Sequence, residues 1–305
     1  MLKINTEELK SNGSNVAINN RYEFVILFDV ENGNPNGDPD ANNMPRIDVD
    51  TNKGLVSDVA IKRKIRNVIS SYYSEEEGFD IYINRDTYLN KKDEKALEDL
   101  KERNINKENE EEHVINYMCS HYFDIRTFGA VMTTFTKKET KLSGNAGQLT
   151  GPVQITFAQS VDEVFPQSIT ITRTAITAEK DADKKTEMGN KWIIPYGLYR
   201  ANGFISANRA EKTGFTYGDL AVLWNAILNM FEEDRSAARG NMAVRKLIIF
   251  KHDSKYGNCP AHKLLESVIV RKKDGIEFAR SFEDYNIIVP SNEQLPEGVT
   301  VEVME

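Results

Sequence analysis

The segment RYEFVILFDV at residues 21–30 constrains the fold more than any other part of this chain. Its apolar residues occupy both sides of a two-residue repeat, with Phe24 and Ile26 on one side and Val25 and Leu27 on the other. A strand that is apolar on both faces is typical of the buried middle of a sheet. The segment therefore predicts a central β-strand.

Residues 31–54 follow this strand and are rich in asparagine, glycine, proline and aspartate, which predicts an ordered loop. A helix is expected next, near residues 57–73, because Ile61 and Ile65 begin an apolar stripe at helical spacing that continues through Val68 and Tyr72. Ser57 or Asp58 can cap its N-terminus.

Residues 74–112 are acidic and poor in core residues, which predicts a helical insertion on the surface. A strand pattern at 153–161 is followed by a polar alternating strand at 168–177, a charged turn at 179–190 and the strand-like KWIIPYG at 191–197. Two strands around a polar tip predict a long projecting hairpin.

The later chain alternates strand and helix patterns, namely a strand at 199–207, a helix at about 217–235, a strand at 243–250 and a short helix at 260–270. This order predicts an α+β fold with a ferredoxin-like core and large insertions.

The net charge of −8 does not exclude a nucleic-acid partner. Residues 75–112 have a net charge of −7 and residues 277–305 a net charge of −6, so the rest of the chain is net positive. Phosphate binding depends on the local electrostatic field of a surface patch and not on the net charge of the chain.

No apolar stretch suits a membrane span, the first residues do not resemble a secretory signal, and two cysteines do not make a disulfide scaffold. We expect a cytoplasmic protein.

Motifs for nucleotide and hydrolase chemistry are missing: there is no phosphate-binding P-loop, no dinucleotide fingerprint and no G-x-S-x-G elbow. Asp38, Asp40 and Asn42 match the start of an EF-hand loop, but Asn43 and Val49 stand where its glycine and bidentate glutamate belong. A turn held by Asn and Asp side chains is the better interpretation.

Zinc is also disfavoured. Cys119 with His121 and Cys259 with His262 supply suitable ligand types, but the first pair lies in an apolar segment and not in a tight knuckle. With no nucleophile–base pair either, we expect no metal, no cofactor and no catalytic residue.

A basic face on the first helix is the strongest signal read from the residues alone. Lys62, Arg63 and Arg66 fall within one arc opposite the apolar stripe and follow a loop rich in backbone N–H donors, a combination that can grip phosphates. An ordinary solvated helix face is the alternative.

Two further groups carry weaker signals. Arg235 and Arg239 with Gly240 are a second basic cluster, or else simply the end of a helix. The hairpin carries Arg173, Lys191 and Trp192, which can wedge or stack against bases, or else belong to a dimerisation arm or a charged strand edge.

Seven strings, taken in order, resemble a known family: FDVENGNPNGDPDANNMPRID, GLVSDVAIKRKIRN, FDIRTFGAVM, GPVQITFAQS, YGLYRANGFIS, NMFEEDRSAARGNM and KLIIFKHDS. They are similar to the type I-C Cascade backbone subunit, from the Cas-seven family of CRISPR-associated proteins in the Csd/DevR branch of the RAMP superfamily. The resemblance covers roughly residues 21–270. It is least in the first twenty residues and at 75–112, and FTKKETKLSGN near 135–145 is longer than usual.

The resemblance implies one elaborated α+β domain with a modified ferredoxin-like, RRM-like palm and a protruding β-hairpin thumb. The implied parts are a palm core at about 21–30, 55–73, 114–163 and 198–276, finger insertions at about 31–54 and 74–113, a thumb at about 164–197 and an acidic C-terminal segment at 277–305. Copies would form a filament on one CRISPR guide RNA, each thumb reaching over a neighbour.

The resemblance also implies partners: the guide RNA, target DNA through the guide heteroduplex, and the cap, large and small Cascade subunits. The RNA-binding residues it implies, together with the basic clusters above, are Asn34, Asn36, Arg46, Ser57, Lys62, Arg63, Arg66, Arg235, Arg239, Gly240 and Asn241, with Arg173, Lys191 and Trp192 on the thumb.

Two functions remain open from the sequence. The first is a non-catalytic RNA-binding scaffold. The second is a metal-dependent ribonuclease, because related type III backbone subunits cut RNA with a finger-loop aspartate, for which Asp38 or Asp40 could be offered. No paired carboxylate or histidine accompanies these aspartates, which favours the scaffold.

Overall fold

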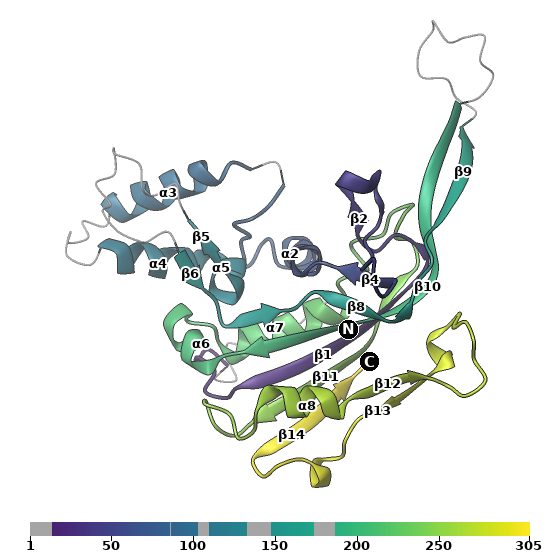
Figure 1. Cartoon of the computed structure of the whole chain (residues 1–305). Coiled ribbons are helices and arrows are strands. Elements are labelled where there is room, and N and C mark those ends of the chain that lie inside the picture. Colours follow the sequence, from purple (N-terminus) through teal and green to yellow (C-terminus); the bar gives the residue numbers. More distant parts are fainter. Residues whose placement is uncertain (1–13, 86, 103–109, 133–147, 174–186) are drawn as a thin grey trace, which may run out of the picture.

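The computed structural model describes residues 14–85, 87–102, 110–132, 148–173 and 187–305. Within these ranges the centre of the molecule is an antiparallel sheet of eight strands (Figure 1). Its order is β14–β11–β1–β10–β8–β4, and β7 and β9 also pair with β10. The strands are β1 (Tyr22–Gly33), β4 (Lys53–Val56), β7 (Val153–Ile155), β8 (Ala158–Glu163), β9 (Gln167–Arg173), β10 (Glu187–Ile205), β11 (Met242–His252) and β14 (Val299–Met304).

The predicted central strand is confirmed, because β1 lies between β10 and β11 and is antiparallel to both. Phe24 stands opposite Gly203 of β10, and a Cβ atom at Gly203 would lie 1.9 Å from the Phe24 ring. Only glycine lets this ring lie across the neighbouring strand.

Helices cover one face of the sheet. They are α2 (Asp58–Tyr72), α5 (Phe123–Phe128), α6 (Ala207–Thr213) and α7 (Tyr217–Leu228). Phe24 and Phe28 of β1 face these helices, and the Phe24 ring meets the Trp224 ring of α7 edge-on at 5.0 Å. The apolar stripe predicted for α2 lies in the same core, with Ile61, Ile65 and Val68 fully or almost fully buried.

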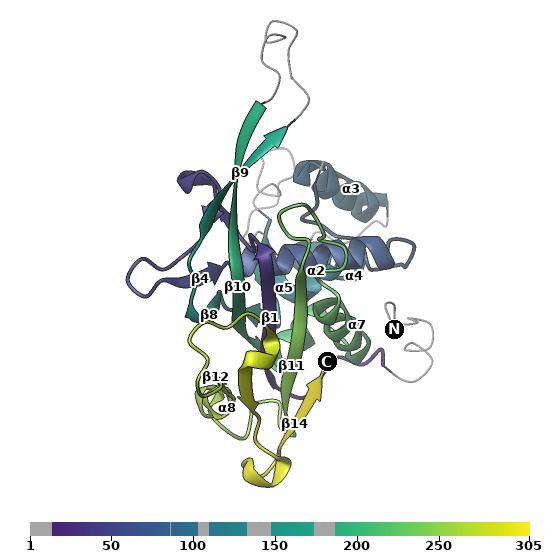
Figure 2. The same cartoon turned by 90° about the vertical axis from the view of Figure 1, so that its right-hand side faces the viewer.

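The opposite face is covered by α8 (Ala261–Ser267) and by the two-stranded sheet of β12 (Ile269–Lys272) and β13 (Tyr285–Ile288) (Figure 2). Val25 and Leu27 of β1 pack there. Residues 277–305, which the sequence marked only as an acidic C-terminal segment, supply β13 and the edge strand β14, which pairs with β11.

The acidic insertion forms α3 (Leu89–Glu102) and α4 (Glu110–His121), followed by α5 and by β5 (Gly129–Val131), which pairs with β6 (Gln148–Thr150). Its helices were expected, but the expectation of a purely surface insertion, poor in core residues, is wrong because the insertion helps to build a core of its own. Tyr82, Leu97 and Met118 belong to a separate small core. Among the described residues, the remaining short elements are β2 (Gly37–Asp38), β3 (Met44–Pro45) and three short 3₁₀ helices at Pro39–Ala41, Phe282–Asp284 and Asn292–Gln294.

The hairpin pairs β9 with the first part of β10 and projects from the sheet (Figures 1 and 2). The two strands expected at 191–197 and 199–207 are one continuous 19-residue strand, β10. Pro195 does not interrupt this strand. Proline has no backbone N–H to donate, and Asn32, which stands opposite it with a φ of 48°, forms no pair in the β1–β10 ladder. The predicted charged turn at 179–190 lies largely outside the described residues, as does the long string near 135–145.

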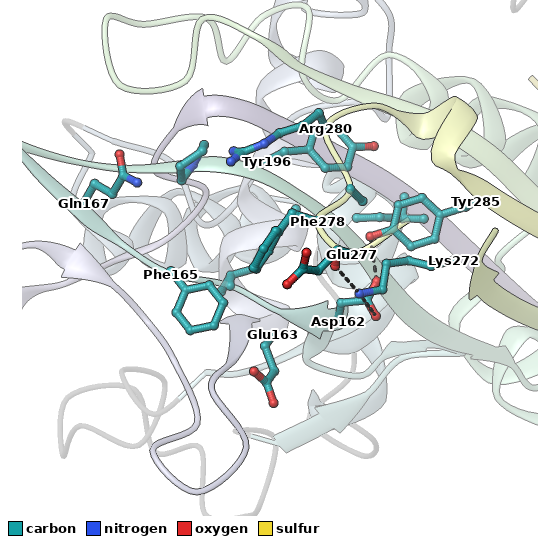
Figure 3. A pocket seen from close by; sticks show the side chains of 15 residues that line it. Asp162, Glu163, Phe165, Gln167, Tyr196, Lys272, Glu277, Phe278, Arg280 and Tyr285 are labelled. Atoms are coloured by element: carbon teal, nitrogen blue, oxygen red, sulfur yellow. Dashed lines mark hydrogen bonds and ion pairs between the residues drawn. The ribbon is translucent and has the colours of Figure 1, made fainter. Parts of the chain in front are cut away.

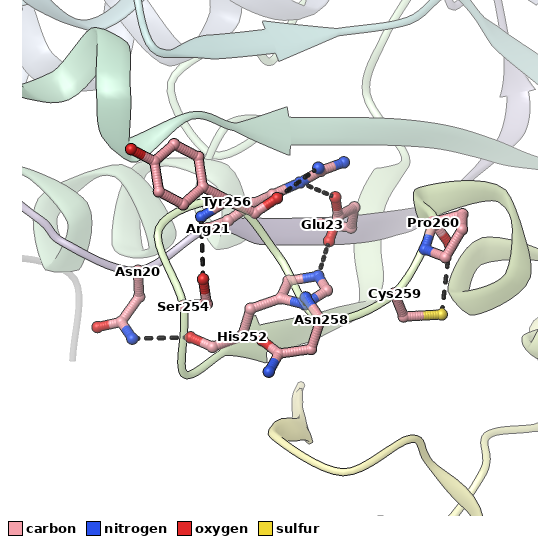
Figure 4. Close-up of polar contacts among 9 residues, drawn as sticks. All are labelled: Asn20, Arg21, Glu23, His252, Ser254, Tyr256, Asn258, Cys259 and Pro260. Carbon is pink, nitrogen blue, oxygen red and sulfur yellow. Dashed lines mark hydrogen bonds and ion pairs between the residues drawn. The ribbon is translucent and has the colours of Figure 1, made fainter.

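A polar cluster around the fully buried Glu23 and His252 joins the start of β1 to the end of β11 (Figure 4). The Nδ1 atom of His252 accepts a hydrogen bond from the backbone N–H of Asn258 at 2.8 Å, so Nε2 carries the proton and donates to Glu23 at 2.5 Å. Arg21 donates to the second oxygen of Glu23 at 2.6 Å. This cluster explains one of the four histidines as structural. None of the described helices is long and apolar enough to cross a membrane.

Candidate nucleic-acid interface

The N-terminus of α2 is held by the loop that precedes it. Ser57 caps the helix by accepting a hydrogen bond from the Ala60 N–H at 3.2 Å. The side-chain oxygen of Asn36 accepts from both the backbone N–H and the hydroxyl of Ser57, at 3.0 and 3.2 Å. Both predicted RNA-binding residues are therefore occupied in fixing the start of α2.

Asparagines shape the loop between β1 and β4. Asn42 and Asn43 adopt left-handed backbone conformations, with φ of 51° and 57°, which asparagine tolerates better than most residues. Gly37 leaves room for the Asn43 side chain, because a Cβ atom at residue 37 would lie 1.9 Å from its side-chain oxygen and force that side chain to move. The prediction of a turn held by Asn side chains is confirmed.

The loop aspartates make contacts inside the loop. Asp38 accepts a hydrogen bond from the Asp40 N–H at 3.1 Å and pairs with Arg46 at 3.3 Å. No cluster of three or more His, Cys, Asp or Glu side chains suited to a metal occurs among the described residues. Cys119 lies in the insertion core and Cys259 packs against the α8 side, so the two halves of the suggested zinc site belong to different clusters.

The expectation that Lys62, Arg63 and Arg66 share one exposed face is wrong for Arg66. This residue is only 9% exposed, and its Nε donates to the fully buried carboxylate of Asp124 at 2.8 Å. Lys62 is partly covered and pairs with Asp58 at 3.0 Å. Arg63 is exposed and has no ion pair within the described part of the chain. The cause of this difference is α5, which follows the insertion: its Asp124 and Phe128 contact Arg66 on the side of α2 that the apolar stripe leaves free.

Asn34 is a second correction, because it is 4% exposed and faces the interior. Its backbone N–H donates to the Ala238 carbonyl at 2.7 Å, and its side-chain amide donates to the Asn43 carbonyl at 2.7 Å. Asn34 therefore links two loops and presents neither group to a ligand.

The helix expected at 217–235 ends at Leu228, so the interpretation of Gly240 as a helix-terminal glycine is wrong. Residues 229–241 instead form a loop that bonds to the end of β1, where the Glu31 N–H donates to the Asn241 carbonyl at 3.0 Å. The Asn241 side chain donates back to the Glu31 carboxylate at 2.5 Å. A continuing helix could not make these contacts.

An ion-pair network that the sequence analysis missed ties this loop to α2. The Asp234 carboxylate accepts from the buried Lys64 of α2 and from Arg239 at 2.7 Å. Burial lowers the pKa of Lys64, while Asp234 opposes this shift and Arg239 and Arg63 add to it. Lys64 follows Ile61 by three residues, and this spacing could have indicated that it lies beside the core stripe.

Other basic side chains of this surface are paired but accessible. Arg235 pairs with Glu232 at 2.6 Å while its side chain stays 59% exposed, and the Arg46 side chain is 37% exposed. Exposed ion pairs contribute little free energy, so an incoming phosphate can compete for these cations. Lys191 and Trp192 lie on β10 in the hairpin and are partly exposed, and Arg173 is the last described residue of β9.

The structure thus brings together three segments: the start of α2, the loop at 34–46 and the loop at 229–241. The loop at 34–46 also contacts the base of the hairpin, because its strand β3 packs against β10 (Figures 1 and 2). We call these three segments, with Arg46, Lys62, Arg63, Arg235 and Arg239, the basic surface.

Comparisons with known proteins agree on one family. Residues 20–290 match the sequence model of the family described as CRISPR-associated protein Cas7. A protein of that description from Haloferax volcanii is 25% identical over 281 residues, covering 87% of this chain and 79% of the relative.

Solved structures give more distant likenesses. A chain of a CRISPR RNA-guided surveillance complex in a pre-nicking state aligns with a TM-score of 0.46 and 12% identity, over 75% of each chain. A chain of a type III-B Cmr-beta complex bound to cognate target RNA aligns with a TM-score of 0.40 and 12% identity, over 80% of this chain and 63% of that one.

Proposed function

We propose, from the premise that this chain belongs to the CRISPR-associated Cas7 family, that it is a non-catalytic scaffold subunit that binds CRISPR guide RNA. Copies of the chain assemble along one guide in a cytoplasmic complex of the type I-C Cascade kind. The guide pairs with target DNA, so the protein itself reads backbone position and shape, not sequence.

The basic surface carries this proposal. It combines cations from three segments with exposed loop backbone, which is the chemistry that positions a phosphate backbone. Arg63 is its main contact, because it is exposed and has no competing carboxylate among the described residues. Arg66 and Asn34 act only by supporting this surface from inside.

The remaining parts fit the same role. The strand order β11–β1–β10–β8, with α2 and α7 on one face, supports a ferredoxin-like palm. The loop at 31–54 and the insertion at 74–113 are its fingers. The projecting β9–β10 hairpin is its thumb, which reaches a neighbouring copy on the guide. The cap, large and small subunits complete the complex.

The contacts of Asp38 favour a scaffold over a ribonuclease. One of its oxygens accepts from the loop backbone and the other pairs with Arg46, so this carboxylate holds the loop closed. Asp40 is exposed, and its backbone N–H donates the hydrogen bond that the Asp38 carboxylate accepts.

Purification of the chain with its host nucleic acid tests RNA binding directly. We expect an absorbance ratio at 260 and 280 nm that indicates nucleic acid, and short RNAs of uniform length on extraction. Salt should weaken binding of labelled single-stranded RNA. Protein free of RNA, with no affinity for it at low salt, would reject the proposal.

Incubation of labelled RNA with magnesium or manganese separates the scaffold from the ribonuclease. We expect intact RNA with the wild-type protein, and RNA binding retained by the Asp38→Ala/Asp40→Ala variant. Metal-dependent cleavage that disappears in this variant would establish the ribonuclease instead.

A further inference from the structure

The side of the sheet away from α2 differs in charge from the basic surface. This side is formed by α8, β12 and β13 with the connection to β14, and residues 253–305, which include these elements, have a net charge of −4 (Figure 2). Such a side repels nucleic acid and attracts basic groups.

A cavity of about 580 Å³ opens on this side at the base of the hairpin. It lies between the connection from β8 to β9, the middle of β10 and the connection from β12 to β13 (Figure 3). This volume lies in the range that holds a small ligand or a few residues of a peptide.

Aromatic rings dominate the walls of the cavity. Phe165 and Phe278 are 52% and 60% exposed, while Tyr196 and Tyr285 are 8% and 6% exposed and lie deeper. Two large exposed aromatic side chains at one cavity indicate a binding surface more than scattered apolar residues do. Their faces attract a cation.

The charged groups of the cavity divide into satisfied and unsatisfied ones. Asp162 accepts from Tyr285 at 2.8 Å and lies 3.6 Å from Lys272. The carboxylates of Glu163 and Glu277 have no hydrogen bond or ion pair among the described residues. Arg280 also lacks an ion pair there but lies beside Tyr196, away from Glu163 (Figure 3). The unpaired groups therefore leave one negative charge in excess.

We propose that this cavity binds an arginine side chain on a basic segment of a partner protein. A guanidinium group is flat enough to lie against an aromatic ring and can donate to a carboxylate, and Phe165, Phe278, Glu163 and Glu277 bring both kinds of group to this cavity. Its neighbouring backbone fills the rest of the cavity. This site is separate from the basic surface, and neither depends on the other.

A labelled glycine–arginine peptide is the probe, with a matched peptide that carries citrulline, an uncharged isostere of arginine. We expect the full chain to bind the arginine peptide and to bind the citrulline peptide about tenfold more weakly, the effect of one charge-assisted hydrogen bond. Fluorescence anisotropy measures both, and equal affinities would overturn the proposal.

The Glu163→Gln/Glu277→Gln variant should lose about tenfold in affinity for the arginine peptide, because both acceptors lose their charge. Glu293→Gln/Glu297→Gln is the matched control, since both residues are exposed, do not line the cavity and lie in the connection from β13 to β14, whose Leu295 packs in the core on the same side. An equal loss in both variants would show a general acidic surface and no site.

Phe165→Ser/Phe278→Ser tests the aromatic walls and should abolish peptide binding while leaving RNA binding unchanged. Two results would assign the cavity to another occupant: self-association in sedimentation that this variant abolishes, which would indicate a second copy, or RNA that crosslinks to Phe278. Either would reject the partner-protein assignment.

Discussion

Arg66 of α2 donates from Nε to the fully buried Asp124 of α5 at 2.8 Å, and this pair holds the insertion against the sheet domain. Asp124 also accepts from the backbone N–H groups of Tyr82 and Ile83, at 2.8 and 3.1 Å. The Arg66 guanidinium lies 5.3 Å from the Phe128 ring centre. One carboxylate therefore organises three segments.

Replacing Arg66 with leucine should lower the free energy of unfolding by about 3–5 kcal/mol, because it leaves a buried carboxylate without its counter-charge. Urea unfolding measures this. Arg63→Leu is the matched control on the same helix and should change stability by about 0.5 kcal/mol or less, since Arg63 is exposed. Equal effects of the two substitutions would contradict the burial of Arg66.

Arg63→Glu should weaken RNA binding and make it less sensitive to salt. Losing one phosphate contact with a single strand lowers the slope of log affinity against log salt by about 0.7. Lys263→Glu, an exposed lysine on α8 across the sheet, is the control of equal charge change and should have little effect. A loss of affinity that is the same for both variants would mean that only net charge matters.

The sequence predicted those elements whose pattern is local. The alternation in β1 and the apolar stripe of α2 depend on neighbouring residues, and the structure confirms both. Arg66 was misplaced because its burial depends on Asp124, which is distant in sequence. The same limit hid the Lys64–Asp234 pair. The edge strand β14 was missed because Glu302 and its acidic neighbours resemble a solvated tail.

The end of α7 shows a different limit. Its start was readable, because Thr216 and Asp219 form a capping box. Its end after Leu228 is set by the contacts of residues 229–241 with the end of β1. The spacing of apolar residues along the helix carries no information about these long-range contacts. The basic residues of that loop were therefore found, while the network that positions Arg239 was not.

Asp93 in the insertion should make stability fall as pH rises. Burial raises the pKa of Asp93 to about 6, although the Tyr82 hydroxyl, which donates to it at 2.9 Å, opposes this shift. Between about pH 4 and pH 6 the folded protein holds a proton on Asp93 that the unfolded chain releases, so the free energy of unfolding falls as the pH rises. Above about pH 6 both states have released this proton, and the loss of stability due to Asp93 is complete.

Asp93→Asn should therefore raise the free energy of unfolding at pH 7 relative to wild type, and this advantage should shrink as pH falls below 6. Urea unfolding of both proteins at several pH values isolates the difference from the other carboxyl groups. A difference that stays constant from pH 4 to pH 7 would contradict the raised pKa.

Trp192 should stack against RNA from the polar face of the hairpin. It stands opposite Ser168, on the same face as Thr170 and Asn190, which bond to each other at 3.2 Å. Trp192→Ala should cost about 1–3 kcal/mol of binding free energy for a stacked base, and Trp192→Phe should recover most of it. Because the side chain is partly exposed, the melting temperature should change little.

Ile171→Ala, on the opposite face of the same strands, is the control and should leave RNA affinity unchanged. A large drop in melting temperature with unchanged RNA affinity would mean that Trp192 supports the sheet and that the hairpin is not used on RNA.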